Sequence, residues 1–282
     1  MRQTLNQGNY FSRGIDWPIK AFDAAQAADF YQRFVDFQHQ SILRRGKETH
    51  IKPHLVSTWL DRVTHHPAIV EAVKVALGPN IVLWTSDFAN KEAGAGTFVP
   101  WHQDTPYWNL SDTKVVSVWL ALSESKKYNG AMRVFPATHN EGALGRINIE
   151  GDPHEAYKEG TRTSSEGNIF AYDHIMDKDI DESLASDVEL DPGQFSLHNI
   201  QLLHGGGPNE SDHDRVGFVM RFISADTFCN TGLDSVTPIS GNCERDHFVL
   251  EERPDADFSD QALNTLQIAL QYPSGFGDRK VQ

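Results

Sequence analysis

The spacing of apolar residues predicts helices in the first third of the chain. Residues 24–45 place phenylalanines and an isoleucine at roughly helical intervals, with Asp23 as a candidate N-cap and Gly46 as a candidate stop. Residues 67–77 begin with proline and are followed by Gly78, which is typical of a second helix. The pattern therefore predicts that the N-terminal region is helical and supports the rest of the domain.

From residue 81 the pattern changes to short apolar runs that are typical of strands. The runs that we interpret as strands are residues 81–88, 115–122, 131–136, 194–198 and 215–224. Asn129-Gly130 is a strong turn signal between two of them. Two further helices are predicted at residues 54–62 and 259–270.

This order of elements predicts one mainly β domain with flanking helices, a sandwich or jelly roll. A doubly wound parallel sheet would need regularly alternating helices, and the pattern does not show them. We divide the domain into helical support (1–80), a jelly-roll core (81–226) that contains a polar excursion or lid (141–186), and a C-terminal extension with a helix (227–282).

Composition narrows the class of protein. The formal net charge of −14 repels phosphate backbones and anionic membranes, so we expect neither nucleic acid nor a membrane as partner. No apolar run approaches the ~18 residues that cross a bilayer. The two cysteines, Cys229 and Cys243, form no disulfide pattern, which favours a reducing compartment. We expect a cytoplasmic protein with a small-molecule substrate, and the oligomeric state stays open.

His102-Gln103-Asp104 is the first candidate for chemistry. On an extended segment residues i and i+2 point to the same face, so His102 and Asp104 project together. Two histidines and one carboxylate on one side of ferrous iron leave open positions for reaction. The tripeptide alone is equally compatible with a surface His–Asp pair, so a distant histidine must complete the site.

His204 is followed by Gly205-Gly206-Gly207, which lets the backbone turn away. Arg215 lies eleven positions later, at the start of a strand that we predict to run antiparallel to one ending at His204. A guanidinium pairs with a carboxylate through two hydrogen bonds, although an internal ion pair is an equal alternative.

Together these motifs resemble the phytanoyl-CoA dioxygenase family of iron(II)/2-oxoglutarate oxygenases over about residues 80–226. The pieces that carry the resemblance are Asn90-Lys91, His102-Gln103-Asp104, residues 116–121, Asn129-Gly130, residues 136–139, residues 204–209 and Arg215. It implies a double-stranded β-helix (jelly-roll) fold.

The resemblance implies that iron(II) is bound by His102, Asp104 and His204, and that Arg215 binds the distal carboxylate of 2-oxoglutarate. Asn90, Ser117 and Trp119 fall where family members contact this co-substrate. His198 competes as a ligand, but the glycine turn and the spacing to Arg215 favour His204. Many members carry serine where this chain has Gly206, so a second anchor for 2-oxoglutarate must come from elsewhere or is missing.

The implied reaction uses O2 to convert 2-oxoglutarate into succinate and CO2 while an unactivated C–H bond is hydroxylated. Related halogenases lack the carboxylate ligand, so Asp104 favours hydroxylation. Residues that could contact the substrate are Thr105, Tyr107, Trp108 and Arg133, while Arg221 or Lys91 could also meet an anionic group. A small zwitterion, for example an aminoalkylphosphonate, would suit aromatic and basic side chains together, although the aromatic residues are equally compatible with ordinary core.

Two other functions stay open on the sequence. The first is a cupin-type metalloenzyme that does not use 2-oxoglutarate, in which Arg215 would be structural. The second is a catalytically silent binding module, which the intact set of His102, Asp104 and His204 disfavours. Formation of succinate separates the two enzymes, and any iron-dependent activity excludes the silent module.

Overall fold

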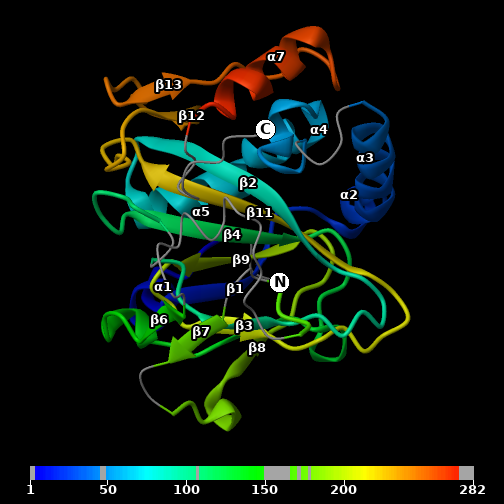
Figure 1. The fold of residues 1–282 in the computed structure, drawn as a ribbon, viewed down its shortest axis with the longest axis vertical. Helices are drawn as coiled ribbons and strands as arrows, with labels where there is room; N and C mark the ends of the chain where they lie inside the picture. The colour runs from blue at the N-terminus through cyan, green and yellow to red at the C-terminus, as the bar shows by residue number, and fades with distance from the viewer. Residues whose placement is uncertain are drawn as a thin grey trace.

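Two β-sheets form the centre of the molecule in the computed structural model, which describes residues 4–44, 49–105, 108–148, 166–169, 173–176 and 179–272. The larger sheet has the order β1-β9-β4-β11-β2-β12-β13 and the smaller one β3-β10-β5-β8 (Figure 1). This arrangement confirms the predicted mainly β fold with flanking helices, which is the jelly-roll architecture.

The larger sheet contains β1 (Ile15–Lys20), β9 (Gln194–Asn199), β4 (Val115–Ala121), β11 (Arg215–Ser224), β2 (Ile81–Lys91), β12 (Asp234–Ser240) and β13 (Phe248–Leu250). The smaller sheet contains β3 (Val99–His102), β10 (His204–Gly206), β5 (Met132–Val134) and β8 (Ser186–Val188). A separate pair is β6 (Gly145–Asn148) with β7 (Asp173–Met176).

The α-helices are α1 (Gln7–Arg13), α2 (Ala24–Ala27), α3 (Phe30–Arg44), α4 (Thr58–Thr64), α5 (Pro67–Leu77) and α7 (Asp260–Ala269). Short 3-10 turns are η2 (Pro53–Leu55), η4 (Lys127–Asn129), η5 (Thr138–Asn140) and η6 (Glu182–Leu184). Among the described residues, no helix is both long and apolar enough to span a bilayer. Both cysteines are buried free thiols.

Side chains along the central strands β4 and β11 point alternately to the two faces of the large sheet. One face packs into the core, and the other, which we call the functional face, carries Ser117, Trp119, Arg215 and Arg221. On β11 the buried side chains of Val216, Phe218, Met220 and Phe222 join the large apolar core that includes residues of α3, α4, α5 and α7. Val116, Val118 and Leu120 of β4 join the same core. By the two-residue period, the intervening residues of both strands face the opposite side. Helices thus cover one face of the large sheet and leave the other for the site.

The predicted helix over residues 24–45 is two helices. The capping box of Asp23 and Gln26 starts the short α2, which ends at Ala27, and a new helix begins at Phe30. Asp29 explains the interruption, because its carboxylate accepts from Arg33 Nε at 2.6 Å and its carbonyl accepts from Arg33 N. An aspartate favours the start of a helix over its interior. Gly46 lies outside the described residues.

The predicted helix over residues 54–62 is also wrong in its bounds. The 3-10 turn Pro53–Leu55 comes first, and α4 begins after Ser57, whose hydroxyl accepts from Leu60 N. Ser57 provides the N-cap that starts the helix proper.

Several strands were not predicted. β1 lies in the supposedly helical N-terminal region, β6 and β7 lie in the polar stretch 141–186, and β12 and β13 lie in the C-terminal extension. β1 is an edge strand that contains Pro18, and its pairing with β9 shifts between Asp16 and Ile19. Proline is tolerated at an edge because no neighbour needs its missing N–H, yet it obscures a strand pattern. The helices at 67–77 and near 259–270 and the strand at 215–224 are confirmed.

Candidate active site

Two histidines meet where β3 and β10 pair. His204 is directly opposite His102 in the antiparallel register, and their ring centroids are 4.0 Å apart. One expectation was wrong: His204 begins β10 and does not end a strand, and β10 pairs with β3 and β5, not with the strand of Arg215. The glycine after His204 fits this pairing, since a Cβ at Gly205 would lie 3.1 Å from the Val99 carbonyl oxygen.

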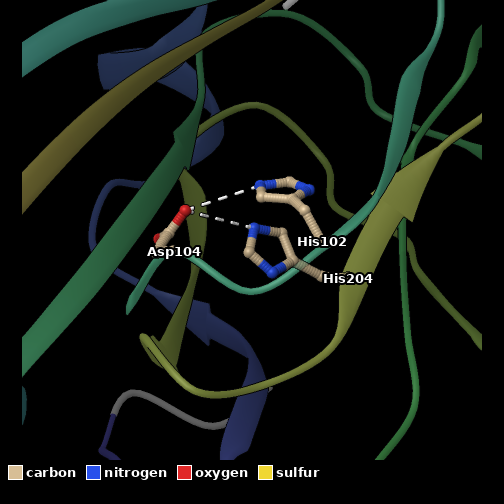
Figure 2. Close-up of side chains that lie close together, drawn as sticks. All are labelled: His102, Asp104 and His204. Atoms are coloured by element: carbon tan, nitrogen blue, oxygen red, sulfur yellow. Dashed lines mark ion pairs between the residues drawn. The ribbon is translucent and has the colours of Figure 1, made fainter. Parts of the chain in front are cut away.

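Asp104 completes the cluster from the loop that follows β3. Its N–H donates to the Ile200 carbonyl at 2.9 Å. Its Oδ1 lies 3.4 Å from His102 Nε2 and 3.9 Å from His204 Nε2 (Figure 2). Potential ligand atoms of the three residues lie within 4.8 Å of one another, the only such group among the residues that the structure describes. His198 is not a member, although its ring centroid is 5.1 Å from that of His204.

Backbone carbonyls fix the orientation of both imidazoles. His102 Nδ1 lies 2.9 Å from the Pro100 carbonyl oxygen, and His204 Nδ1 lies 2.9 Å from that of Leu202. A carbonyl can only accept, so each Nδ1 carries the proton and each Nε2 keeps its lone pair toward Asp104. This is the arrangement that a metal-binding histidine requires. The donor set therefore fits ferrous iron.

Gln103 holds the intervening loop in place, a role that the sequence did not reveal. Its side-chain nitrogen donates to the carbonyls of Gly142 and Gln201, at 2.9 and 2.6 Å, and its oxygen accepts from Leu144 N at 2.8 Å. Because both N–H groups and the oxygen of this buried amide are engaged, the backbone between the two ligands is held in position.

The electrostatics of the cluster favour an ionised Asp104 carboxylate beside a neutral His204 imidazole. Burial would raise the pKa of Asp104, but the interactions with His102, His204 and Arg221 outweigh it and hold the pKa below its ordinary range. Burial, with the nearby His102, lowers the pKa of His204 well below its ordinary value. Metal ligation needs these two protonation states.

Arg215 and Trp119 lie together on the functional face of the large sheet. The Arg215 guanidinium is buried and lies 5.0 Å from the Trp119 ring centroid, and its Nε has no hydrogen-bond partner among the described residues. Gly217 makes room for the indole, because a Cβ there would lie 2.1 Å from Trp119 Cζ2. Burial lowers the pKa of Arg215 to about 10.

Lys91 lies directly opposite Arg215. From the sequence we expected it only as a residue that could meet an anionic group. Its ammonium is buried and donates to the carbonyls of Gly130, Gly206 and Gly207. Burial, reinforced by the charge of Arg215, lowers the pKa of Lys91 to about 7. A Cβ at Gly206 would lie 3.1 Å from Lys91 Nζ. The lysine therefore adjoins the position where many family members carry serine.

Two further residues were expected to contact the co-substrate, and only one of them lies on the functional face. Ser117 is buried with an unpartnered Oγ, and it shares the face of Trp119 as predicted. Asn90 is exposed and alternates with the buried Lys91, so the structure does not bring it to the face of Arg215.

The expected substrate contacts are also spread apart. Thr105 adjoins Asp104 and donates to the Ile200 carbonyl at 3.3 Å. Trp108 is buried, and its ring packs edge-on against Trp84. Arg133 is engaged by Glu182, with Nη1 and Oε2 2.6 Å apart, and by Asp187. Tyr107 lies outside the described residues.

Comparison with known proteins identifies the family. The family model of phytanoyl-CoA dioxygenase (PhyH) matches residues 19–217, which is more than half of the chain. The chain belongs to the phytanoyl-CoA dioxygenase family. It is therefore a member of the iron(II)- and 2-oxoglutarate-dependent dioxygenases, as the resemblance of the motifs indicated.

Among curated relatives of this phytanoyl-CoA dioxygenase family member is a probable alpha-ketoglutarate-dependent hypophosphite dioxygenase of Stutzerimonas stutzeri, 28% identical over 62% of the chain and 57% of that protein. A phytanoyl-CoA dioxygenase domain-containing protein 1 of Danio rerio is 27% identical over 79% of the chain and 72% of that protein. The chain thus spans little more than half the length of the first of these relatives.

Solved structures agree with the family. The non-heme monooxygenase ThoJ in its apo form superposes with a TM-score of 0.78 at 30% identity, covering 94% of this chain and 95% of that one. CytC3 with Fe(II) and alpha-ketoglutarate has a TM-score of 0.64 at 17% identity, covering 92% and 98%, which shows a shared fold.

Proposed function

We propose that this protein is a dioxygenase that hydroxylates a small polar metabolite, with iron(II) bound by His102, Asp104 and His204. The observation that carries the proposal is the convergence of their ligand atoms within 4.8 Å, with both Nδ1 atoms hydrogen-bonded to the backbone. Bound iron would supply the oxidising chemistry by bringing O2 and 2-oxoglutarate together. The chain's own residues position the co-substrate and the substrate.

Arg215 and Lys91 are the proposed site for the distal carboxylate of 2-oxoglutarate. Both cations are buried on opposed positions of β11 and β2, and neither pairs with a carboxylate among the described residues. Buried charges without a counterion are costly, so an anionic ligand would stabilise both. The three N–H groups of Lys91 donate to backbone carbonyls, so the lysine would contribute its charge, and not the hydrogen bond that a serine in place of Gly206 would give.

A small zwitterion, such as an aminoalkylphosphonate, is the proposed substrate. Relatives named for small polar molecules support this class: hypophosphite dioxygenase, and an ectoine dioxygenase of Streptomyces avermitilis that is 23% identical over 70% of the chain. The phosphorus oxyanion of the first relative agrees with basic side chains on the functional face.

The decisive experiment follows succinate. Anaerobically iron-loaded protein receives 2-oxoglutarate and air with a panel of amino acids, betaines and phosphonates. We expect succinate to rise with one substrate in the wild type, and the apparent KM for 2-oxoglutarate to rise about tenfold to a hundredfold in Arg215→Ala, because a hydrogen bond to a charged group contributes about 1.5–3 kcal/mol. Arg245→Ala, which removes an exposed pair with Asp226, is the matched control. Iron binding without succinate under any condition would instead favour a metalloenzyme that does not use 2-oxoglutarate.

Binding of 2-oxoglutarate is expected to weaken as pH rises above about 7. Lys91 has a pKa of about 7 without ligand, and a bound dianion favours its ammonium form. Above pH 7 binding must therefore take up a proton, so the Kd should rise by up to about tenfold per pH unit. Calorimetry from pH 6.5 to 9, in two buffers of different ionisation enthalpy, measures both the Kd and the proton uptake. A Lys91→Met variant should flatten the profile, and a steep profile in this variant would contradict the assignment.

A further inference from the structure

Three polar side chains form a row across the functional face of the large sheet, beyond the proposed co-substrate site. His198 of β9 is opposite Ser117 of β4, and Ser117 is opposite Arg221 of β11. Directly opposed residues have Cβ atoms about 4.5–5.5 Å apart, so the imidazole, hydroxyl and guanidinium are neighbours. All three groups can donate hydrogen bonds to one acceptor.

The row adjoins the metal-binding cluster. The His198 ring centroid is 5.1 Å from that of His204. His198 and Ser117 are 3% and 1% exposed, and within the part of the chain that the structure describes neither His198 Nδ1 nor Ser117 Oγ has a hydrogen-bond partner. Buried polar atoms are nearly always satisfied in native proteins, so two unpartnered atoms side by side indicate a ligand or ordered water.

Arg221 contributes the charge of the row. Its Nη1 donates to Asp87 Oδ2 at 2.9 Å, and its guanidinium lies 5.5 Å from the Trp108 ring centroid. The side chain of Arg221 is 15% exposed and that of Asp87 is 35% exposed, so solvent reaches the pair. The carboxylate stabilises the guanidinium when no ligand is bound, and an ion pair of this kind can exchange partners.

This row is separate from the Arg215 and Lys91 pair. Arg221 lies six residues after Arg215 on the same strand, which is about 20 Å at 3.3 Å per residue. The Trp119 indole lies over Gly217 and near Arg215, between the two groups along β4 and β11. One small dicarboxylate bound at Arg215 does not extend over that distance, so Arg221 is available to a second ligand.

We propose that Arg221, Ser117 and His198 bind an oxyanion of the substrate, either a carboxylate or a phosphonate. This inference rests on the proposed function and names the substrate group that the protein recognises. Donors from three strands meet the acceptor oxygens of an anion beside the metal, and the guanidinium provides two parallel N–H groups. Asp87 remains beside the anion, where it can receive an ammonium group of a zwitterion.

Calorimetry with defined probes tests the inference. Methylphosphonate, acetate and 2-aminoethylphosphonate are titrated into wild-type protein that holds iron(II) and 2-oxoglutarate under anaerobic conditions. We expect Arg221→Gln to weaken the binding of the preferred probe about tenfold to a hundredfold, with an unchanged Kd for 2-oxoglutarate. Comparison of methylphosphonate with acetate identifies the preferred oxyanion, and Arg245→Gln, which loses the pair with Asp226, is the matched control.

Asp87→Asn distinguishes recognition from a structural ion pair. Removing this carboxylate removes one competitor for the Arg221 guanidinium, so methylphosphonate should bind several-fold more tightly, whereas a structural pair would give no gain. Loss of 2-oxoglutarate affinity in Arg221→Gln would overturn the inference and assign the row to the co-substrate. Failure of all three probes to bind the wild type would also overturn it. Failure of wild type to bind 2-oxoglutarate would remove the proposed function instead, and the anion titrations would still decide the role of Arg221.

Discussion

Replacing His204 with alanine is expected to abolish tight iron binding. The variant leaves one imidazole and one carboxylate, which is too few protein ligands for a facial site. Loss of a group that hydrogen-bonds to a metal ligand typically weakens metal affinity about 10–100-fold. Loss of the ligand itself should therefore weaken iron affinity by at least about a hundredfold. Iron retained after desalting and succinate formed per protein are the two measurements.

His198→Ala provides the matched control for this experiment. His198 is also buried, and its ring centroid is only 5.1 Å from that of His204. Its alanine variant should nevertheless retain iron, because the ligand atoms that converge belong to His102, Asp104 and His204. Retention of iron by His204→Ala together with its loss in His198→Ala would reverse the assignment of the third ligand.

Local patterns predicted much of this site because its ligands depend on short-range geometry. His102 and Asp104 are two residues apart, and a period of two places such residues together without knowledge of the fold. The resemblance to the family then supplied His204 and Arg215. The expected pairing of their strands was wrong, since β10 lies in the small sheet and β11 in the large one. Sheet membership depends on long-range packing, which spacing along the chain does not contain.

The sequence could not establish which of two adjacent residues, Asn90 or Lys91, contacts the co-substrate. The resemblance implied that Asn90 contacts the co-substrate, whereas the structure places Lys91 on the face of Arg215. The register of β2 with β11 decides this, because Lys91 is the residue opposite Arg215. A shift of one residue would exchange the two side chains between faces. The same limit applies to Arg221, whose position beside Ser117 follows only from the register of β11 with β4.

A buried polar network attaches the C-terminal extension to the core, and it predicts the largest effect on stability. Lys52 Nζ lies 2.5 Å from Glu251 Oε1 and donates to the Ser235 carbonyl at 2.7 Å. The second oxygen of Glu251 accepts from Thr237 at 2.5 Å. The side chains of Lys52 and Glu251 are 0% and 2% exposed. These contacts join the segment before α4 to β12 and to the residues after β13.

Glu251→Gln should lower the free energy of unfolding by about 3–5 kcal/mol, since it leaves the Lys52 ammonium buried without its counterion. Urea unfolding followed by circular dichroism measures the change at pH 7. Glu71→Gln is the matched control: it removes a pair with Lys74 in which the side chains are 70% and 32% exposed. Exposed pairs contribute about 1 kcal/mol or less. Similar losses in the two variants would show that the buried pair has no special role.

The stability that the pair of Lys52 and Glu251 contributes is expected to depend on pH. Burial would raise the pKa of Glu251, but the charge of Lys52 and the hydrogen bond and charge of His54 outweigh it and lower the pKa to about 2. The unfolded carboxyl titrates near 4.5, so the stabilisation is complete above that pH and is lost as pH falls toward 2. The difference in unfolding free energy between wild type and Glu251→Gln should therefore be constant from pH 7 to 5 and shrink below pH 4.5. A difference that stays the same at pH 3 would show that the carboxylate charge does not provide the stabilisation.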